Sequence, residues 1–260
     1  MGRMYAARAI AERAASVTLW DRDSAALAQT ARELGAVARG RTQVRSYVVD
    51  VGDLGAIAKT AHQVRRAAGT PDVLVNNAGI VRGNRYFWEA DSGDDTRATM
   101  RVNALAPMYI AREFLPGMIA SHRPARIVNI ASAAGTLANP RMAVYAASKA
   151  AVIGWSDSLR IELEQAGHAH VRVTTVTPSY VSTGMFAGAR GPLLAPVLAP
   201  DVVVDRVWKG MIAGRPLVQL PWSVGLSRVL RAVLPVRVFD RVVGDGFGVY
   251  SSMERFTGRG

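Results

Sequence analysis

Short runs of apolar residues alternate along the chain with longer stretches in which apolar residues recur at helical spacing. The short runs predict strands at 17–20, 44–49, 72–75, 126–130 and 171–177. The helical stretches lie at 3–15, 24–34, 54–68, 96–121, 144–166 and near 201–213. Strands that are apolar on both faces and are separated by helices are typical of a parallel sheet covered by helices on both sides. The pattern therefore predicts an α/β fold with a doubly wound parallel sheet, as a single domain over 1–260.

The last part of the chain departs from this alternation. Residues 188–243 form a C-terminal apolar region that is rich in Gly, Pro and Leu up to residue 221. Within it, residues 222–243 are apolar with Arg at intervals, and Pro235 should break or kink a helix there. Two interpretations stay open. The segment is either a helix packed on the core or a basic amphipathic segment in peripheral contact with a membrane.

Composition excludes several classes of protein. Half of the 260 residues are hydrophobic, which is enough for a sizeable core and too much for a disordered chain. Cysteine is absent and only four His are present, so we expect no disulfide, no Cys nucleophile and no metal site. No run of 18 uncharged apolar residues and no secretory signal occurs, which favours a cytoplasmic location.

The net charge of +12 invites a nucleic-acid or anionic-membrane partner. Only three of the 32 basic residues are Lys, and the Arg residues are scattered without a long run. Such a composition also arises from GC-rich codons. Because no nucleic-acid-binding motif accompanies the charge, we expect no nucleic-acid partner.

Candidate chemistry begins with Tyr145 and Lys149, which lie four residues apart in a predicted helix and so share a face. A neighbouring ammonium favours the phenolate and lowers the pKa of a Tyr, which makes the phenol a usable acid/base. Ser132 follows the predicted strand 126–130, where its hydroxyl could donate to a substrate oxygen. Asn103 is a polar group within the long helix, and by itself would be a packing amide.

Polar or small residues also follow the other predicted strands, at the end where such sheets bind ligands. A carboxylate in the place of Asp21 can accept hydrogen bonds from the hydroxyls of an adenosine ribose, and Asp50 with Val51 could meet the adenine ring. The small and polar run 76–79 permits close approach of the backbone to a ligand. A further run, Pro178 to Thr183, follows the strand 171–177.

Taken together, these motifs are similar to those of the classical short-chain dehydrogenase/reductases, from Gly2 to about Thr183. The matching elements, in order, are NNAG at 76–79, Asn103, Ser132, YxxxK at 145–149 and PxxVxT at 178–183. The stretches VTLWDRD and LVQLPWS, with the apolar tail, resemble more loosely the branch of membrane-associated 17-beta-hydroxysteroid and retinol dehydrogenases.

The resemblance implies a Rossmann-like fold and a role for each matching residue. Tyr145 would be the acid/base, Lys149 would hold the nicotinamide ribose, Ser132 would orient the substrate, and Asn103 would support a water-linked proton relay. The residues implied at the cofactor are Gly2, Asp21, Asp50, Val51, Asn77, Ala78, Gly79, Tyr145, Lys149, Pro178, Val181 and Thr183. Asp21 favours NAD, because a carboxylate repels the 2′-phosphate of NADP, although the neighbouring Arg22 leaves NADP open.

Two departures from the family pattern stand out. Ser179 takes the place of a Gly. More seriously, the family begins with a strand and a TGxxxGxG turn, of which only Gly2 and the helix after it are present. We therefore expect the first strand and most of the Gly-rich loop to be missing, either because the true start lies upstream of Met1 or because the chain is shortened.

The sequence thus predicts an NAD(P)-dependent oxidoreductase that interconverts an alcohol and a carbonyl. The apolar region 188–243, on the substrate side, favours a hydrophobic sterol, retinoid or lipid-like substrate, and the family resemblance implies a homo-oligomer. The alternative is a catalytically impaired family member that serves as a binding or interaction protein. Apolar residues expected near the substrate are Met185, Phe186, Leu193, Leu194, Trp208, Trp222 and Leu226.

Overall fold

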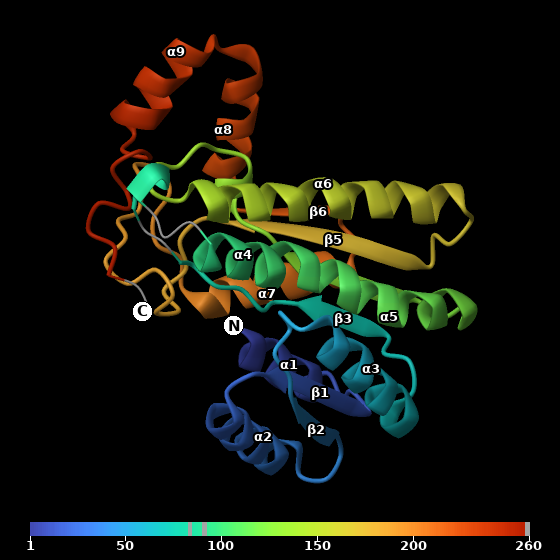
Figure 1. Ribbon diagram of the computed structural model, residues 1–260. Helices are drawn as coiled ribbons and strands as arrows, with labels where there is room; N and C mark the ends of the chain where they lie inside the picture. The colour runs from blue at the N-terminus through green and yellow to red at the C-terminus, as the bar shows by residue number, and fades with distance from the viewer. Residues whose placement is uncertain (83–84, 90–92, 258–260) are drawn as a thin grey trace.

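The computed structural model describes residues 1–82, 85–89 and 93–257 and consists of parallel strands sandwiched between helices (Figure 1). The strands are β1 (Ser16–Asp21), β2 (Gln43–Val48), β3 (Val73–Asn76), β4 (Ala125–Ile130), β5 (Val171–Pro178) and β6 (Leu217–Leu220). The main helices are α1 (Gly2–Ala11), α2 (Ser24–Ala38), α3 (Leu54–Ala68), α4 (Asp94–Met100), α5 (Ala106–Ala120), α6 (Ala143–Gln165), α7 (Pro200–Ile212), α8 (Trp222–Val233) and α9 (Val236–Phe239). The α/β class predicted from the apolar pattern is confirmed.

All pairings between strands are parallel, but the strands form two sheets rather than one. One sheet has the order β1-β2 and the other the order β3-β4-β5-β6. Within the described residues, β1 and β3 share no hydrogen-bonded ladder. The parallel pairing that the sequence predicted is confirmed. The further expectation, that a first strand and most of a Gly-rich loop are missing, stays a prediction.

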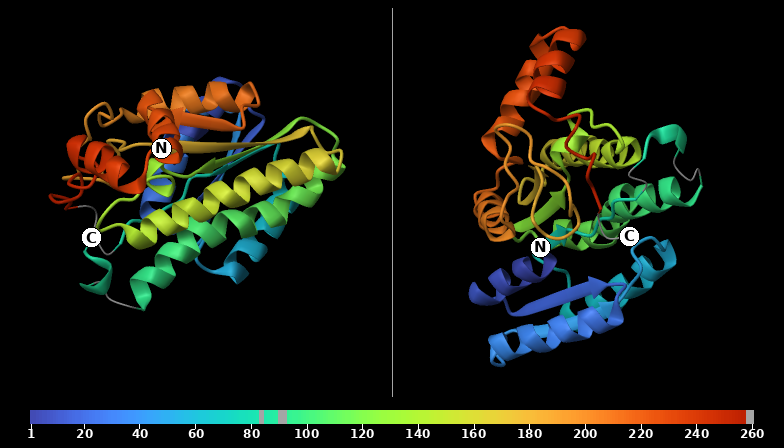
Figure 2. Two further views of the ribbon diagram at one scale, coloured as in Figure 1. Left: turned by 90° about the horizontal axis from the view of Figure 1, so that it is seen from above. Right: turned by 90° about the vertical axis from the view of Figure 1, so that its left-hand side faces the viewer.

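The helices form a layer on each side of the strands (Figures 1 and 2). One layer contains α3, α5 and α6, and its core includes Ile57, Phe114 and Leu163 packed with Ile127 of β4. On the opposite face, α1 and α7 pack on the larger sheet, and Val128, the next residue of β4, belongs to that second core. Successive strand residues point to opposite faces, so each buried strand contributes to both cores.

Two parts of the prediction need correction. The helix expected at 96–121 is interrupted, because a π-helical segment, η2 (Arg101–Leu105), lies between α4 and α5. The strand β6 was missed, since only four residues of the apolar region 188–221 form it, and they alternate between half-buried and buried. By contrast, Pro235 separates α8 from α9 as expected, because it lies between their last and first residues.

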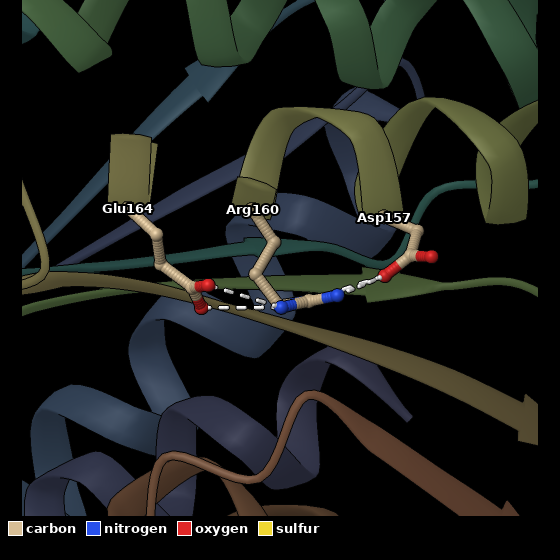
Figure 3. A network of polar contacts seen from close by, with 3 residues as sticks. All are labelled: Asp157, Arg160 and Glu164. Atoms are coloured by element: carbon tan, nitrogen blue, oxygen red, sulfur yellow. Dashed lines mark hydrogen bonds and ion pairs between the residues drawn. The ribbon is translucent and has the colours of Figure 1, made fainter. Parts of the chain in front are cut away.

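Helix α6 carries the candidate catalytic pair near its start and an ion-pair network further along (Figure 3). The guanidinium of Arg160 lies 2.7 Å from a carboxylate oxygen of Asp157 and 3.1 Å from one of Glu164. These carboxylates raise the pKa of Arg160, and the hydrogen bond that Arg160 donates to Asp157 is the largest influence. The carboxylates are solvent-exposed, so each pair stabilises the helix by only about 0.3–0.5 kcal/mol.

The cores, not these surface charges, should hold the fold together. Replacing Ile127, which is fully buried in β4, with Ala should lower the free energy of unfolding by roughly 2–5 kcal/mol, because a cavity is left behind. The matched control is Ile161→Ala on α6, where the side chain is 38% exposed and the loss should stay below about 1 kcal/mol. Urea denaturation of both variants measures the difference. Equal losses would contradict the assignment of the core.

Candidate active site

Two hydroxyls meet where β4 ends and α6 begins. Ser132 follows β4 and caps the short 3-10 helix Ala133–Gly135, with its Oγ accepting a hydrogen bond from Ala134 N at 3.2 Å. Tyr145 lies in the first turn of α6, and its phenol faces the same pocket as the Ser132 side chain, near enough for that hydroxyl to lower the pKa of the phenol. Both residues are buried. The predicted pair of hydroxyls is therefore brought together by the turn between the strand and the helix.

Lys149 lies one turn further along α6 and is also buried. Its Nζ donates a hydrogen bond to the carbonyl oxygen of Ile130 at 2.9 Å, and lies 5.7 Å from the centre of the Tyr145 ring. Burial lowers the pKa of Lys149 to about 8. The side chain thus holds an ammonium in a place where desolvation makes the charge costly.

The acidity of Tyr145 differs from the sequence-based expectation. Burial raises the pKa of Tyr145 above its ordinary value, the hydrogen bond with Ser132 lowers it, and nearby Tyr180 raises it again. This direction is opposite to the one expected for a Tyr beside an ammonium, because desolvation is the largest influence on the phenol. Within the chain itself, Ser132 is the group that favours the phenolate.

Asn103 lies in the π-helical segment η2, not in a regular helix, and is almost fully buried. Its Oδ1 accepts a hydrogen bond from Ile80 N at 2.8 Å, and its Nδ2 donates to Ile80 O at 2.9 Å. The Nδ2 also donates to Ser148 Oγ at 3.2 Å. A single amide therefore connects the loop after β3 to α6, between the residues of the Tyr-Lys pair.

The run after β3 lies against the same groups. A Cβ added at Gly79 would lie 3.4 Å from Asn103 Oδ1 and 3.6 Å from Lys149 Nζ, so any larger side chain would occupy the space beside the ammonium. A Cβ at Gly2 would lie 3.1 Å from Asn77 Nδ2. The Oδ1 of Asn77 is buried without a hydrogen-bond partner. Ala78, between Asn77 and Gly79, is exposed.

The remaining predicted residues lie at the ends of other strands. Asp21 ends β1 with an exposed carboxylate that accepts only a local bond, from Asp23 N at 3.1 Å, and Asp50 likewise accepts from Gly52 N at 2.8 Å. Val51 packs against the first core. The rest follow β5: Pro178 is its last residue, Val181 is buried in a bridge with Leu198, and Thr183 N donates to Val181 O at 2.7 Å.

Comparison with known proteins decides the family. The family described as short chain dehydrogenase matches residues 1–192. This chain belongs to the short-chain dehydrogenase/reductases. It is 31% identical to epidermal retinol dehydrogenase 2 of Mus musculus, over 100% of this chain and 82% of that protein. It is 32% identical to estradiol 17-beta-dehydrogenase 11 of Rattus norvegicus, over 86% of this chain and 73% of that protein.

Solved structures of the family agree. A short-chain dehydrogenase/reductase from Burkholderia phymatum in complex with NAD superposes with a TM-score of 0.74 and 26% identity, covering 86% of this chain and 88% of that chain. A metagenomic short-chain oxidoreductase in complex with NADP superposes with a TM-score of 0.67 and 32% identity, covering 85% of this chain and 92% of that chain. As a short-chain dehydrogenase/reductase, the protein is an NAD(P)-dependent dehydrogenase acting on CH–OH groups.

The site fits a nicotinamide dinucleotide on structural grounds. Gly79 leaves the space beside Lys149 open, and the buried Oδ1 of Asn77 has no partner within the described chain. Asp21 presents an exposed carboxylate at the end of β1. These are the features that a ligand with an amide and ribose hydroxyls would use. No group of three or more potential metal ligands occurs among the described residues.

An apolar pocket of about 790 Å³, counting the part open to solvent, adjoins the two hydroxyls. Ser132 and Tyr145 line it, and so do four of the apolar residues expected near the substrate, namely Phe186, Leu193, Leu194 and Leu226. Trp208 instead lies in the core formed by α7, and Trp222 is exposed. Met185 is not among the lining residues.

The sequence analysis missed several pocket residues. Tyr180 lines the pocket beside Tyr145, and its hydroxyl is bonded to Asn139 Nδ2 at 2.9 Å and to Ser252 Oγ at 2.8 Å. Tyr180 lies within the run after β5, which was a signal in the sequence. Phe247 and Val249 also line the pocket, but they come from the C-terminal segment, and no local pattern places them there.

The buried ammonium has a measurable consequence. Between pH 8 and 10.5 the folded protein has lost the Lys149 proton while the unfolded chain retains it, so the free energy of unfolding should rise with pH. Relative to Lys149→Met, wild type should gain roughly 1–3 kcal/mol across this interval. Denaturant titrations at several pH values measure it. As a control, Lys59→Met, at an exposed position of α3, should keep the pH dependence of wild type. If the difference in free energy of unfolding between wild type and Lys149→Met does not change with pH, Lys149 is not a buried charge.

Proposed function

We propose that the enzyme oxidises or reduces a hydrophobic alcohol/carbonyl pair, of a sterol, retinoid or lipid-like kind, in the pocket above Tyr145. The observation that carries this proposal is the meeting of two hydroxyls, of Tyr145 and Ser132, at the wall of a mainly apolar pocket. A pocket with few polar groups fixes the orientation of an apolar ligand through those groups. The names of the relatives, a retinol and an estradiol dehydrogenase, are consistent with such ligands.

The chain's own residues would handle the proton. In the direction of oxidation, Tyr145 Oη takes the proton of the substrate hydroxyl, while Ser132 Oγ holds the substrate oxygen by a second hydrogen bond. Before substrate binds, the same hydroxyl stabilises the phenolate, since its bond lowers the pKa of Tyr145. When bound, NAD(P) supplies the redox chemistry by exchanging a hydride with the substrate carbon.

Lys149 and Asn103 act around this pair. The ammonium of Lys149, beside the open space at Gly79, is positioned to bind ribose hydroxyls and to favour negative charge on the phenol. Asn103 fixes the loop after β3 and so keeps that space open. Asn77, Ala78, Gly79, Val181 and Thr183 would border the dinucleotide. Homo-oligomerisation stays a prediction of the sequence.

Tyr145→Phe tests the reaction. The variant should lose at least about a hundredfold in kcat, because the proton acceptor is gone, while folding and NADH binding persist. The readout is absorbance of NADH with a secondary long-chain alcohol as substrate. Tyr47→Phe, on β2 away from the pocket, is the matched control and should keep its rate. A Tyr145→Phe enzyme that keeps the full rate would contradict the proposal. If nicotinamide fluorescence shows that wild type does not bind NADH, the alternative of a catalytically impaired binding or interaction protein is favoured instead.

We also propose NAD as the preferred cofactor, with Asp21 as the discriminating residue. Asp21→Ser removes the carboxylate that would repel a 2′-phosphate, so the ratio of kcat/KM for NADP over NAD should rise about tenfold or more. Asp72→Ser is the control. Asp72 precedes β3 at the opposite end of the sheet, where it pairs with Arg123 at 2.9 Å. An unchanged ratio in Asp21→Ser would contradict the assignment.

A further inference from the structure

The C-terminal helices form a projection that stands off the body of the enzyme. We call α8, α9 and the following π-helical segment η4 (Asp240–Gly246) the C-terminal hairpin. Figures 1 and 2 show it extending away from the sheets, with its two arms side by side. The arms are held together from within, where Phe239 and Val243 are buried and Arg231 stacks on the Phe239 ring at 5.9 Å. The hairpin is therefore an ordered unit with an outer surface of its own.

That outer surface is apolar. Along α8, Trp222 is 68% exposed, Val229 61% and Val233 70%, and beyond the break Val236 is 75% exposed. The spacing of seven and four residues places the first three on one side of the helix. Within α8 only Ser223 and Val224 are buried. A contiguous apolar stripe of this kind on a helix marks a contact surface, because isolated exposed apolar residues do not line up in this way.

The charge around the stripe identifies the contact. Four Arg lie within residues 222–243, and the only acidic residue there is Asp240, which accepts a hydrogen bond from Tyr250. The hairpin holds one further carboxylate, Asp245, so its four arginines outnumber its acidic residues. Among the described residues, no ion pair joins the exposed Arg228, Arg237 or Arg241 to a carboxylate. Two such surfaces would repel each other, so a second copy of the chain is a poor occupant. An anionic lipid surface complements both the apolar stripe and the arginines.

The stripe is also connected to the pocket. Helix α8 turns its other side inward, where Val224, Ser227 and Leu230 line the pocket beside Tyr145. Leu226, 39% exposed, and Leu193, 63% exposed, both line the pocket and reach the surface. Ser223 Oγ donates a hydrogen bond to Leu194 O at 2.7 Å and so fixes α8 to the loop that carries Leu193 and Leu194. The apolar mouth of the pocket thus lies next to the stripe.

From these observations we infer that the C-terminal hairpin docks on an anionic membrane surface, with the apolar stripe in the lipid interface, and that substrate enters the pocket from the lipid. The docking surface rests on exposure and charge alone. The route of entry rests in addition on the proposed function, since it requires a lipid-soluble substrate. Among the described residues, none of the helices could span a bilayer.

Vesicle flotation tests the docking surface without any measurement of turnover. Wild type should float with vesicles of phosphatidylcholine containing phosphatidylserine, and binding should fall in high salt because the arginine contribution is screened. It should float at least about tenfold less with phosphatidylcholine alone. Tyr145→Phe should float like wild type, so a failure of the proposed reaction leaves this test intact.

Variants with matched controls locate the surface. Val229→Asp with Val233→Asp, and separately Arg237→Glu with Arg241→Glu, should each weaken binding to the anionic vesicles at least about tenfold. The controls are Val37→Asp with Val202→Asp and Arg32→Glu with Arg66→Glu, at exposed helical positions elsewhere, and they should bind like wild type. Circular dichroism verifies the fold of each variant.

Four outcomes would overturn the inference. If wild type does not float with the anionic vesicles at low salt, the hairpin is not a membrane-binding surface. Equal flotation with anionic and neutral vesicles removes the role of the arginines. Hairpin variants that bind like wild type, or hairpin variants that lose a concentration-dependent dimer while wild type binds no vesicles, assign the stripe to something other than lipid.

Discussion

The bond from the Lys149 ammonium to the Ile130 carbonyl is the constraint on which the site depends. It attaches α6 to the end of β4, one turn beyond Tyr145, and it does so inside the protein, where a charge is costly. A second buried contact attaches the same helix to the same strand further along, from Asn129 Nδ2 to Ser156 Oγ at 2.8 Å. With the helix fixed at two places, the phenol of Tyr145 has little freedom, and its meeting with Ser132 follows from the register of α6 against β4.

The same fixed helix separates two tasks. On its buried side, near the first turn, the environment is dry and raises the pKa of Tyr145, which is unfavourable for a group that must give up a proton. The hydroxyl of Ser132 is the group of the chain that offsets that cost. Further along, Arg160 and its two carboxylates keep the solvent side of the helix charged without touching the chemistry.

Much of this could be predicted from the sequence, for identifiable reasons. Helix α3 was predicted with the bounds that the structure shows, because Asp53 caps its start and Gly69 follows its end. Tyr145, Lys149 and Ser132 were placed correctly because helical spacing and strand ends are local features. The short strand β6 and the contribution of Phe247 to the pocket depend on contacts between distant segments, and no local pattern contains them. The direction of the Tyr145 pKa also depends on burial, which spacing alone does not give.

The π-helical turn at Asn103 has a consequence for how this enzyme can change. Such a turn holds one residue more than an α-helix would, and that extra residue sets the side of the helix on which Asn103 emerges. Loss of a single residue there would let α4 and α5 merge into one regular helix. That would swing the amide by about 100° away from Ile80, since each helical residue turns by that angle. Most helices can lose a residue near an end without effect on other segments. In this helix the loss of one residue at Asn103 would remove the hydrogen bonds that fix the loop after β3.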